Sequence, residues 1–425
     1  MIRLVMRQFG LGFSTLDLMG YQTSMIQLKH FMILTGLIFA ANQTLPAQHQ
    51  RLGLEGASVT ERGRTLFEWV WEPTNLPRPL DRSDGLGPMF NGKSCAECHH
   101  QGGTGGGGIG LHNTEIITAW PVTDKTGHIS TRQKLGEIHE GLKVSSSVIL
   151  HKESLNSSYA DYRQKVAGKH ADFTIFLTQR NTPSLFGLGL VDQLNAKILL
   201  QQEAMQASLG LTGRVSRTDD GRVGKFGWKA QKASLKEFVE EAAAAELGLE
   251  SRTKHQGSDP RKPVEPASTT DLSDEQLDAI TAYVSSLPKP KSKLSKDESP
   301  GQELFRQIGC QDCHVDKLGD ISGIYSDLLL HDMKPELQEA GSYAIFGVSN
   351  PGKSVSTNDS VKASEWRTPP LWGVGSTPPY LHDGSAKCLE DAIANHGGEA
   401  LESARKFLQL NSDQRNELLK FLRSL

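Results

Sequence analysis

The sequence predicts a mainly α-helical protein made of two similar halves that are connected by long loops. Three observations support this fold class. Each half contains one C-x-x-C-H motif, at residues 95–99 and 310–314. Each half also contains a T-P-x-L-[FW]-G-[LV]-G segment, at residues 182–189 and 368–375, and each half ends in a pattern of apolar residues at helical spacing. The same parts in the same order indicate two domains built on one plan.

The segments around each motif are the expected helices. RGRTLFEWVW precedes the first motif and SPGQELFRQIG precedes the second, while LSDEQLDAITAYVSSLP and LNSDQRNELLKFLRSL close the two halves. Ser273 and Ser412 occupy the positions expected for the N-caps of the closing helices. The proline and glycines of the two T-P-x-L segments predict an extended or turning backbone there.

Composition suggests where the domains begin and end. The apolar stretch at residues 31–41 predicts an export signal over residues 1–47, with Met25 as an alternative start, and it is too short to span a membrane. The polar, proline-bearing run PKPKSKLSKDESP predicts a linker. We therefore expect an N-terminal domain over residues 48–288, a linker over 289–300 and a C-terminal domain over 301–425. The N-terminal domain contains a long insertion between His99 and Arg180 that the second half lacks.

Length, charge and cysteine count narrow the class of protein. A chain of 425 residues is long enough for two domains, and its net charge of -3 argues against nucleic acid as a principal partner. Four of the five cysteines lie in the two motifs and Cys388 stands alone, which is not the pattern of a disulfide framework.

The C-x-x-C-H motif is typical of covalent haem attachment. The thiols of Cys95 and Cys98, or of Cys310 and Cys313, add to the haem vinyl groups, and the following histidine ligates the iron. A structural zinc site would use both cysteine pairs without explaining the histidine after each, and a dithiol redox site would need a βαβ context. The motifs therefore predict two cytochrome-c-like domains, each with one covalently bound haem c. A zinc site and a dithiol redox site are the alternatives.

The ligand on the opposite face of each iron distinguishes an electron-transfer haem from a catalytic one. A sixth protein ligand favours electron transfer, whereas an iron without one can bind peroxide or oxygen. Aligning Leu235 with Leu389 places His396 opposite Ala242, which cannot ligate a metal. His396 is therefore a candidate ligand beside His314, and His99 has no counterpart at the matching place. A histidine that caps a helix C-terminus is the alternative interpretation of His396.

Four segments carry a resemblance to a known family: DGLGPMFNGKSCAECHH, RNTPSLFGLGL, FGWKA and EWRTPPLWGVGSTPPYLHDGSAKCLEDAIANHGGEA. They resemble the di-haem oxidoreductases related to bacterial di-haem cytochrome c peroxidases, over nearly everything after the signal. The resemblance implies two haem domains, with hydrogen peroxide bound at the N-terminal haem. The C-terminal haem would relay electrons from a small periplasmic donor, a cytochrome c or a cupredoxin. The resemblance is also compatible with a homodimer.

The resemblance also implies roles for single residues. Trp228 matches the tryptophan between the haems, and Glu246 is the nearest match to the proton-transfer glutamate, with Glu240 and Glu241 as rivals. His396 stands where the peroxidases use methionine. Because imidazole ligation gives a lower iron potential than thioether ligation, this departure puts the usual electron donor in doubt.

Three further metal ligands are implied by position. His170 and His112 are candidates for the removable histidine over the resting N-terminal haem. Asn181 matches a calcium-binding asparagine, which adds Ca²⁺ as a cofactor, although one oxygen ligand does not establish such a site. The main interpretation is an exported di-haem c-type oxidoreductase that reduces peroxide. The alternatives are a non-catalytic di-haem electron-transfer protein and an oxidase of a protein side chain.

Overall fold

The fold is that of a computed structural model of the chain. It describes residues 56–73, 85–121, 132–143, 145, 147–170, 173–257, 259–260, 270–293, 299–333, 337, 339, 343 and 361–425. The chain divides into two units, Met1–Ala57 and Ser58–Leu425. The predicted export signal over residues 1–47 lies outside the described residues, and the following description concerns the second unit. No helix within the described ranges has the length and hydropathy needed to cross a membrane.

Helices dominate both halves, in agreement with the predicted class. The first half contains α3 (Val59–Glu68), α4 (Cys95–Cys98), α5 (Arg132–Leu135), α6 (Tyr159–Val166), α7 (Leu188–Gln193), α8 (Ala196–Ser208), α9 (Leu235–Leu247) and α10 (Asp274–Ser286). The second half contains α11 (Pro300–Gln307), α12 (Leu389–Ala394), α13 (Leu401–Gln409) and α14 (Ser412–Ser424). Short strands also form two-stranded ribbons: β1 (Met89–Phe90) with β4 (Glu153–Ser154), β7 (Ser216–Arg217) with β8 (Val223–Gly224), and β9 (Lys317–Leu318) with β10 (Ile321–Ser322).

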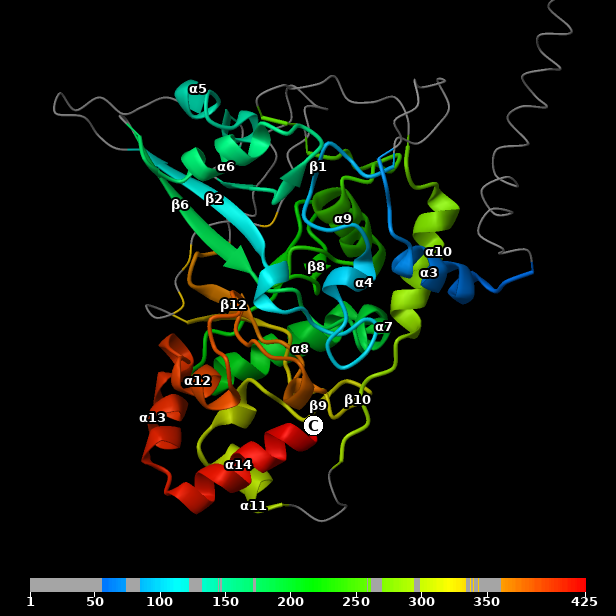
Figure 1. Ribbon diagram of the computed structural model, residues 1–425. Helices are drawn as coiled ribbons and strands as arrows, with labels where there is room; N and C mark the ends of the chain where they lie inside the picture. Colours follow the sequence, from blue (N-terminus) through cyan, green and yellow to red (C-terminus); the bar gives the residue numbers. More distant parts are fainter. Residues whose placement is uncertain are drawn as a thin grey trace, which may run out of the picture. The chain divides into compact units, whose positions relative to one another are not determined.

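Two pairs of helices, one in each half, cross at a glycine. Helix α3 packs against α10, and α11 packs against α14 (Figure 1). A Cβ atom at Gly63 would lie 1.8 Å from the carbonyl oxygen of Ala279, and one at Gly301 would lie 2.1 Å from that of Glu417. Both crossings therefore depend on a residue without a side chain. The shared contact supports the repeated plan that the sequence predicts.

Side-chain caps fix where these helices begin. Ser273 is the N-cap of α10, as predicted, because its side chain accepts a hydrogen bond from the backbone of Gln276. The predicted N-cap Ser412 is wrong, since Asn411 caps α14 and Ser412 is its first residue. This shift places Gln414 at the third helical position, where its side chain bonds back to the N-cap in a capping box.

The two T-P-x-L segments share one backbone turn. Gly187 and Gly373 have φ angles of 72° and 73°, in the left-handed region that favours glycine. The predicted extended or turning backbone ends at these glycines. Helix α7 begins at the next residue, Leu188, and a 3₁₀ turn (Val374–Ser376) begins at the corresponding place in the second half.

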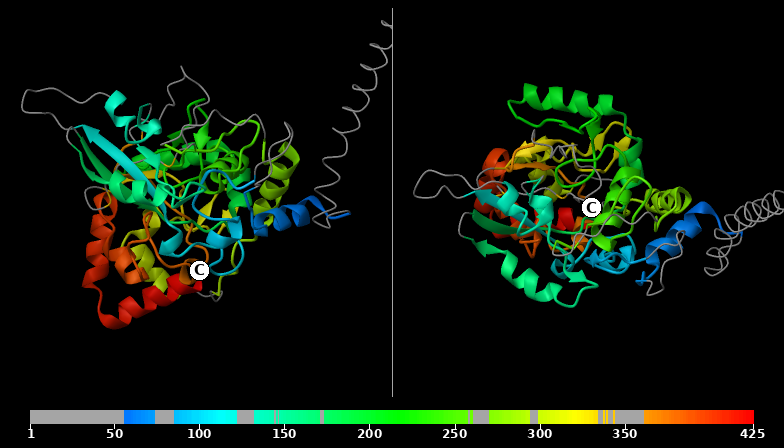
Figure 2. Two further views of the ribbon diagram at one scale, coloured as in Figure 1. Left: turned by 45° about the horizontal axis from the view of Figure 1, so that its top comes forward. Right: turned by 90° about the horizontal axis from the view of Figure 1, so that it is seen from above.

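The insertion of the first half folds into an antiparallel sheet, which the sequence analysis did not predict. The strand order is β3 (Ser147–Ile149), β2 (Thr114–Pro121), β6 (Phe173–Arg180) and β5 (Gly168–Lys169). Strands β2 and β6 lie side by side in Figures 1 and 2, with Thr114 paired to Arg180. In the second half, β11 (Leu330–Asp332) pairs with β12 (Glu365–Arg367), so that each motif is followed by a hairpin.

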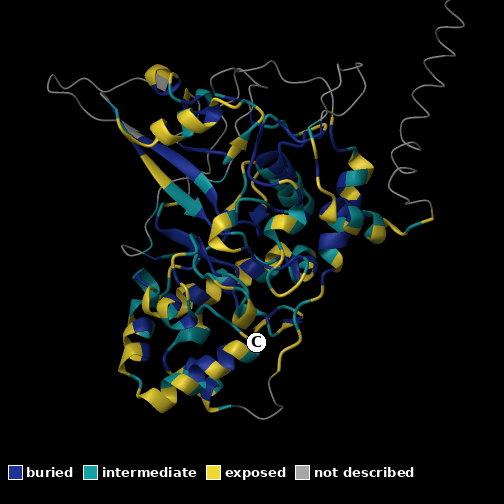
Figure 3. Cartoon of the chain, viewed as in Figure 1, coloured by how far each residue is buried: buried dark blue, intermediate teal, exposed yellow. Residues whose placement is uncertain are grey.

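Separate apolar clusters support the sheet and the second motif. Buried side chains between the sheet and its flanking helices form the first cluster: Ile117, Ala119, Leu135, Leu142, Val148, Leu150, Val166, Phe173 and Ile175. The second cluster joins α11, α13 and α14, whose buried sides are dark blue in Figure 3: Phe305, Ile308, Tyr325, Leu389, Phe407, Leu418, Leu419, Phe421, Leu422 and Leu425. Cys310 packs against this second cluster, so the core fixes the position of the motif.

Candidate functional site

The first motif opens into a cavity that we call the first cavity, lined by Cys95, Cys98 and His99. The Nδ1 atom of His99 lies 3.1 Å from the carbonyl oxygen of Gly106. A proton on Nδ1 that is donated to this carbonyl leaves the lone pair on Nε2, which is the arrangement of a metal-binding histidine.

The glycine run after the motif folds back over it. The backbone N–H of Gly105 donates to the carbonyl of His99 at 2.9 Å. A Cβ atom at Gly106 would lie 1.6 Å from the carbonyl oxygen of Gln101, and one at Gly108 would lie 2.7 Å from that of Cys98. The glycines thus allow the backbone to approach the motif closely enough to supply the carbonyl that orients the histidine.

Burial sets the protonation of the motif side chains. It lowers the pKa of His99 to about 4, against the smaller opposing effect of the hydrogen bond to Gly106. It raises the pKa of Cys95 to about 12. At neutral pH the imidazole is therefore the neutral, metal-binding form, and the thiol is protonated.

The second motif repeats this arrangement in the second cavity, which is lined by Cys310, Cys313 and His314. The Nδ1 atom of His314 lies 2.9 Å from the carbonyl oxygen of Tyr325. Burial lowers the pKa of His314 to about 4. Burial and a hydrogen bond to a backbone carbonyl are thus common to the histidines of both motifs.

The two cavities differ opposite the motif histidine. Leu235 and Leu389 are the first residues of α9 and α12, which supports the alignment made from the sequence. Ala242 lines the first cavity, whereas His396 lines the second. The rings of His314 and His396 have centroids 6.5 Å apart, and Nδ1 of His396 lies 2.7 Å from the carbonyl oxygen of Ala392.

The donor set of the second cavity fits a haem iron. An iron held at about 2 Å by one imidazole nitrogen on each side separates the ring centroids by roughly 6 to 6.5 Å. The 6.5 Å between His314 and His396 matches this span. In the first cavity, the same two thiols and neutral imidazole fit haem attachment, and Ala242, the residue aligned with His396, offers no ligand.

Trp228 lies between the cavities and lines both. Its indole N–H donates to the carbonyl of Asn181 at 2.9 Å, and its own carbonyl accepts from the backbone N–H of Arg367 at 2.9 Å. One contact comes from each half of the chain. The structure thus brings the predicted tryptophan to the boundary between the two donor sets.

Glu246 lines the first cavity, near the end of α9. Its carboxylate accepts hydrogen bonds from Asn91 Nδ2 at 2.7 Å and from Thr114 Oγ1 at 2.8 Å. Of the two rivals, Glu240 bonds Ser251 and Thr253, and Glu241 pairs with lysines, and neither lines this cavity. The structure therefore favours Glu246 among the predicted carboxylates.

The other predicted ligands have different surroundings. His112 lines the first cavity, where its Nδ1 lies 3.6 Å from the Cys98 sulfur. His170 lines neither cavity, because it is held beside the sheet by the Val166 carbonyl and by stacking on Phe173. The structure does not bring His170 to the site.

The amide of Asn181 is already engaged as a donor. Its Nδ2 donates to Asn113 Oδ1 at 2.9 Å and to the Gly108 carbonyl at 3.1 Å. These bonds occupy the amide nitrogen alone and do not involve the side-chain oxygen, which is the atom that would bind a cation, so calcium binding at this residue stays a prediction.

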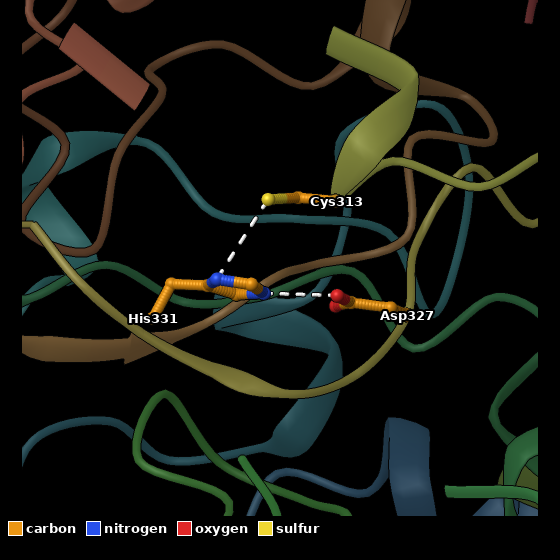
Figure 4. Close-up of side chains that lie close together, drawn as sticks. All are labelled: Cys313, Asp327 and His331. Atoms are coloured by element: carbon orange, nitrogen blue, oxygen red, sulfur yellow. Dashed lines mark hydrogen bonds and ion pairs between the residues drawn. The ribbon is translucent and has the colours of Figure 1, made fainter. Parts of the chain in front are cut away.

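A buried charged cluster beside the second motif was not predicted. His331 lies between two carboxylates, with Nε2 2.8 Å from Asp327 and Nδ1 2.7 Å from Glu399. Its Nδ1 also lies 3.7 Å from the Cys313 sulfur, and Figure 4 shows His331 between Cys313 and Asp327. Burial opposes its protonation, but these hydrogen bonds raise the pKa of His331 to about 12. Three such groups can hold a metal, yet Cys313 belongs to the haem-type motif and both ring nitrogens are occupied.

Another cluster that the sequence did not reveal surrounds Trp366. Its ring stacks on His382 with centroids 3.6 Å apart, and Lys229 Nζ and Arg180 Cζ lie 3.4 and 4.9 Å from its centre. Glu339 accepts from Arg180 at 2.6 Å and from His382 at 2.7 Å. Trp366 lines only the second cavity, so it differs from Trp228 in position.

The protein therefore has two cavities, and each of them contains two thiols and a neutral imidazole, which is the donor set of a haem-attachment site. The model of the family described as "Di-haem oxidoreductase, putative peroxidase" matches residues 147–425. The chain belongs to this di-haem oxidoreductase family, which implies two haem cofactors. The matched range includes the second C-x-x-C-H motif and begins after the first.

Two curated relatives are similar over part of the chain. Cytochrome c551 peroxidase of Nitrosomonas europaea is 29% identical over 137 residues, which cover 32% of this chain and 36% of that protein. Hydrazine synthase subunit gamma of Kuenenia stuttgartiensis is 25% identical over 178 residues, which cover 35% of this chain and 49% of that protein. The chain thus spans about a third of the length of the first relative and about half of the length of the second.

Solved structures show weaker similarity. Hydrazine synthase of Kuenenia stuttgartiensis matches with a TM-score of 0.36 and 18% identity, over 58% of this chain and 73% of that one. A MauG-like protein associated with microbial copper homeostasis has a TM-score of 0.28 and 21% identity, over 50% and 76%. A variant of a diheme peroxidase from Burkholderia thailandensis has a TM-score of 0.33 and 15% identity, over 61% and 74%.

Proposed function

We propose that the protein is an exported, periplasmic di-haem c-type oxidoreductase that reduces hydrogen peroxide. Peroxide binds in the first cavity, and electrons enter through the second. Cys95, Cys98, Cys310 and Cys313 hold the two haems covalently, one in each of two cytochrome-c-like domains, and His99 and His314 ligate the irons. Bound haem would supply the redox chemistry. The remaining steps fall to side chains of this chain.

The asymmetry between the cavities is the observation that carries this proposal. His396 faces His314 at a distance that suits ligation from both sides, whereas Ala242 stands at the matching place in the first cavity. A six-coordinate site transfers electrons, and an open site binds substrate. The second cavity is therefore the relay, and the first is the place of reaction.

Glu246 supplies the acid–base chemistry in the first cavity. Cleavage of the O–O bond requires a group that takes the proton from one peroxide oxygen and returns it to the other. The Glu246 carboxylate lines the cavity, and Asn91 and Thr114 hold its two oxygens in fixed directions.

Trp228 provides the route between the two cavities. It lines both, and backbone hydrogen bonds from each half hold it in place. The donor is a small redox protein, a cytochrome c or a cupredoxin. A relay haem held by His314 and His396 would have a lower potential than one held by histidine and methionine, so the donor would have to be correspondingly reducing.

Replacement of Trp228 with Phe tests this function in the protein with both haems. The fully reduced protein is mixed with hydrogen peroxide, and oxidation of the two haems is followed separately by stopped-flow absorbance. We expect Trp228→Phe to slow the oxidation of the second haem and to leave that of the first unchanged. The matched control Trp69→Phe, which alters an exposed tryptophan that lines neither cavity, keeps both rates. Wild-type protein that leaves peroxide unconsumed would disprove the proposed function.

A further inference from the structure

Arg367, the last residue of β12, carries a buried guanidinium that lines the second cavity. Only 8% of the residue is exposed. Its Nε donates to the carbonyl of Gly227 at 2.9 Å, and its Nη1 donates to the carbonyl of Thr368 at 3.2 Å. Both acceptors are neutral, and within the described ranges Nη2 has no acceptor. The guanidinium therefore keeps a donor for a group in the cavity.

The positive charge of Arg367 also lacks a direct partner. Two other arginines where the halves meet are paired with carboxylates, Arg180 with Glu339 at 2.6 Å and Arg214 with Glu365 at 2.7 Å. No carboxylate in the described part of the chain forms such a pair with Arg367. Its surroundings thus differ from those of the neighbouring arginines.

Asp327 is the carboxylate whose charge acts on Arg367 from beyond ion-pair distance. Its Oδ2 atom is already held by His331 Nε2 at 2.8 Å and by Gln206 Nε2 at 3.1 Å. Burial outweighs this attraction and lowers the pKa of Arg367 to about 10, so the guanidinium is charged at neutral pH. A buried charge is costly unless an opposite charge pairs with it. The second cavity therefore suits an anion beside Arg367.

We propose that Arg367 binds a carboxylate of the haem in the second cavity. This inference rests on the part of the proposed function that places a haem there. A haem carries two carboxylate side chains, and Nη2 of Arg367 is a charged donor for one of them. The backbone N–H of Arg367 donates to the carbonyl of Trp228 at 2.9 Å. The same residue thus connects the haem carboxylate to the tryptophan that lines both cavities.

Two replacements of Arg367 in the haem-loaded protein separate its charge from its shape. Arg367→Met removes the positive charge, which favours the oxidised iron. At a fixed potential we expect the ratio of oxidised to reduced second haem to rise by about tenfold, a fall of about 59 mV in midpoint potential for a one-electron couple. Arg367→Lys keeps the charge, so this ratio changes by less than about threefold. Spectroelectrochemical titration measures both haems, and the first haem keeps its potential.

Resonance Raman spectroscopy reports the hydrogen bond itself, because the bending band of a haem carboxylate side chain shifts when that bond is lost. We expect one such band to shift in Arg367→Met and in Arg367→Lys, since neither side chain has the guanidinium donor. Arg214→Met is the matched control, because it removes a nearby guanidinium that lines neither cavity. It keeps the band of the wild type. If Arg367→Met does not fold, the band in Arg367→Lys decides.

None of these measurements uses peroxide, so they separate this inference from the proposed function. Carboxylate bands that are unchanged in both Arg367 variants would overturn the inference, even if the wild type reduces peroxide. Equal falls in potential in Arg367→Met and Arg214→Met, with unchanged bands, would also overturn it, because the effect would then be a general loss of charge. A band shift at Arg367 that Arg214→Met lacks would support it, even if the wild type leaves peroxide unconsumed.

Discussion

At the scale of single residues, contacts with distant parts of the chain turn a local motif into a reactive site. The neutral state of His99 comes from burial, and its orientation comes from the carbonyl of Gly106. The sequence predicts the motif histidine as a ligand, but it does not predict the neutral state or the carbonyl that orients the ring. The setting of Glu246 depends on Asn91 and Thr114, which lie far from it in the chain. Neither has a pattern that sequence reasoning could connect to a carboxylate on α9.

Glu246→Gln keeps the shape of the side chain and removes its basicity. Because general acid–base groups contribute about 10² to 10⁴ to rate, we expect kcat for peroxide to fall by roughly 100-fold or more. Steady-state peroxide consumption by the haem-loaded protein measures this change. Glu240→Gln, which alters a carboxylate outside the cavity on the same helix, serves as the control. Similar losses in both variants would show that α9 has merely been disturbed.

At the scale of elements, the helices follow from the sequence more completely than the strands. Periodic apolar residues and a serine N-cap predict α10, and capping chemistry explains why α14 begins one residue after its cap. The sheet was missed because β2 pairs with β6, which lies about sixty residues further along the chain, and short strands give weak local patterns. The antiparallel pairing of β11 with β12 joins segments that are likewise far apart in the sequence.

The crossing of α3 and α10 makes a prediction about stability. Gly63→Ala places a methyl group against the Ala279 backbone, so the helices must separate. We expect the free energy of unfolding to fall by about 1 to 3 kcal/mol, as for other overpacked contacts. Urea denaturation followed by circular dichroism measures the loss. Gly110→Ala is the control, since a Cβ atom there meets no other atom within 4 Å, and equal effects at both positions would refute the close crossing.

At the scale of the whole molecule, the proposed function depends on two features: the repeated plan of the two halves and the difference between their two cavities. The repeated motifs, helix crossings and left-handed glycines show that one plan is used in both halves, and the sequence reveals most of this. The difference between Ala242 and His396 is also visible in the sequence once the halves are aligned. What the sequence does not reveal is how the halves meet, because Trp228 and Glu339 act through contacts between them. The division into two domains and the export of the protein stay predictions.

The most direct test of the account is a cyanide titration of the haem-loaded protein, followed by electron paramagnetic resonance and absorbance, in wild type and in His396→Ala. The account predicts that cyanide alters one haem of the wild type and leaves the other low-spin. In His396→Ala the second haem becomes high-spin and binds cyanide as well, because its iron loses one imidazole. Two wild-type haems that both ignore cyanide, or a second haem whose spectrum is unchanged by His396→Ala, would contradict it.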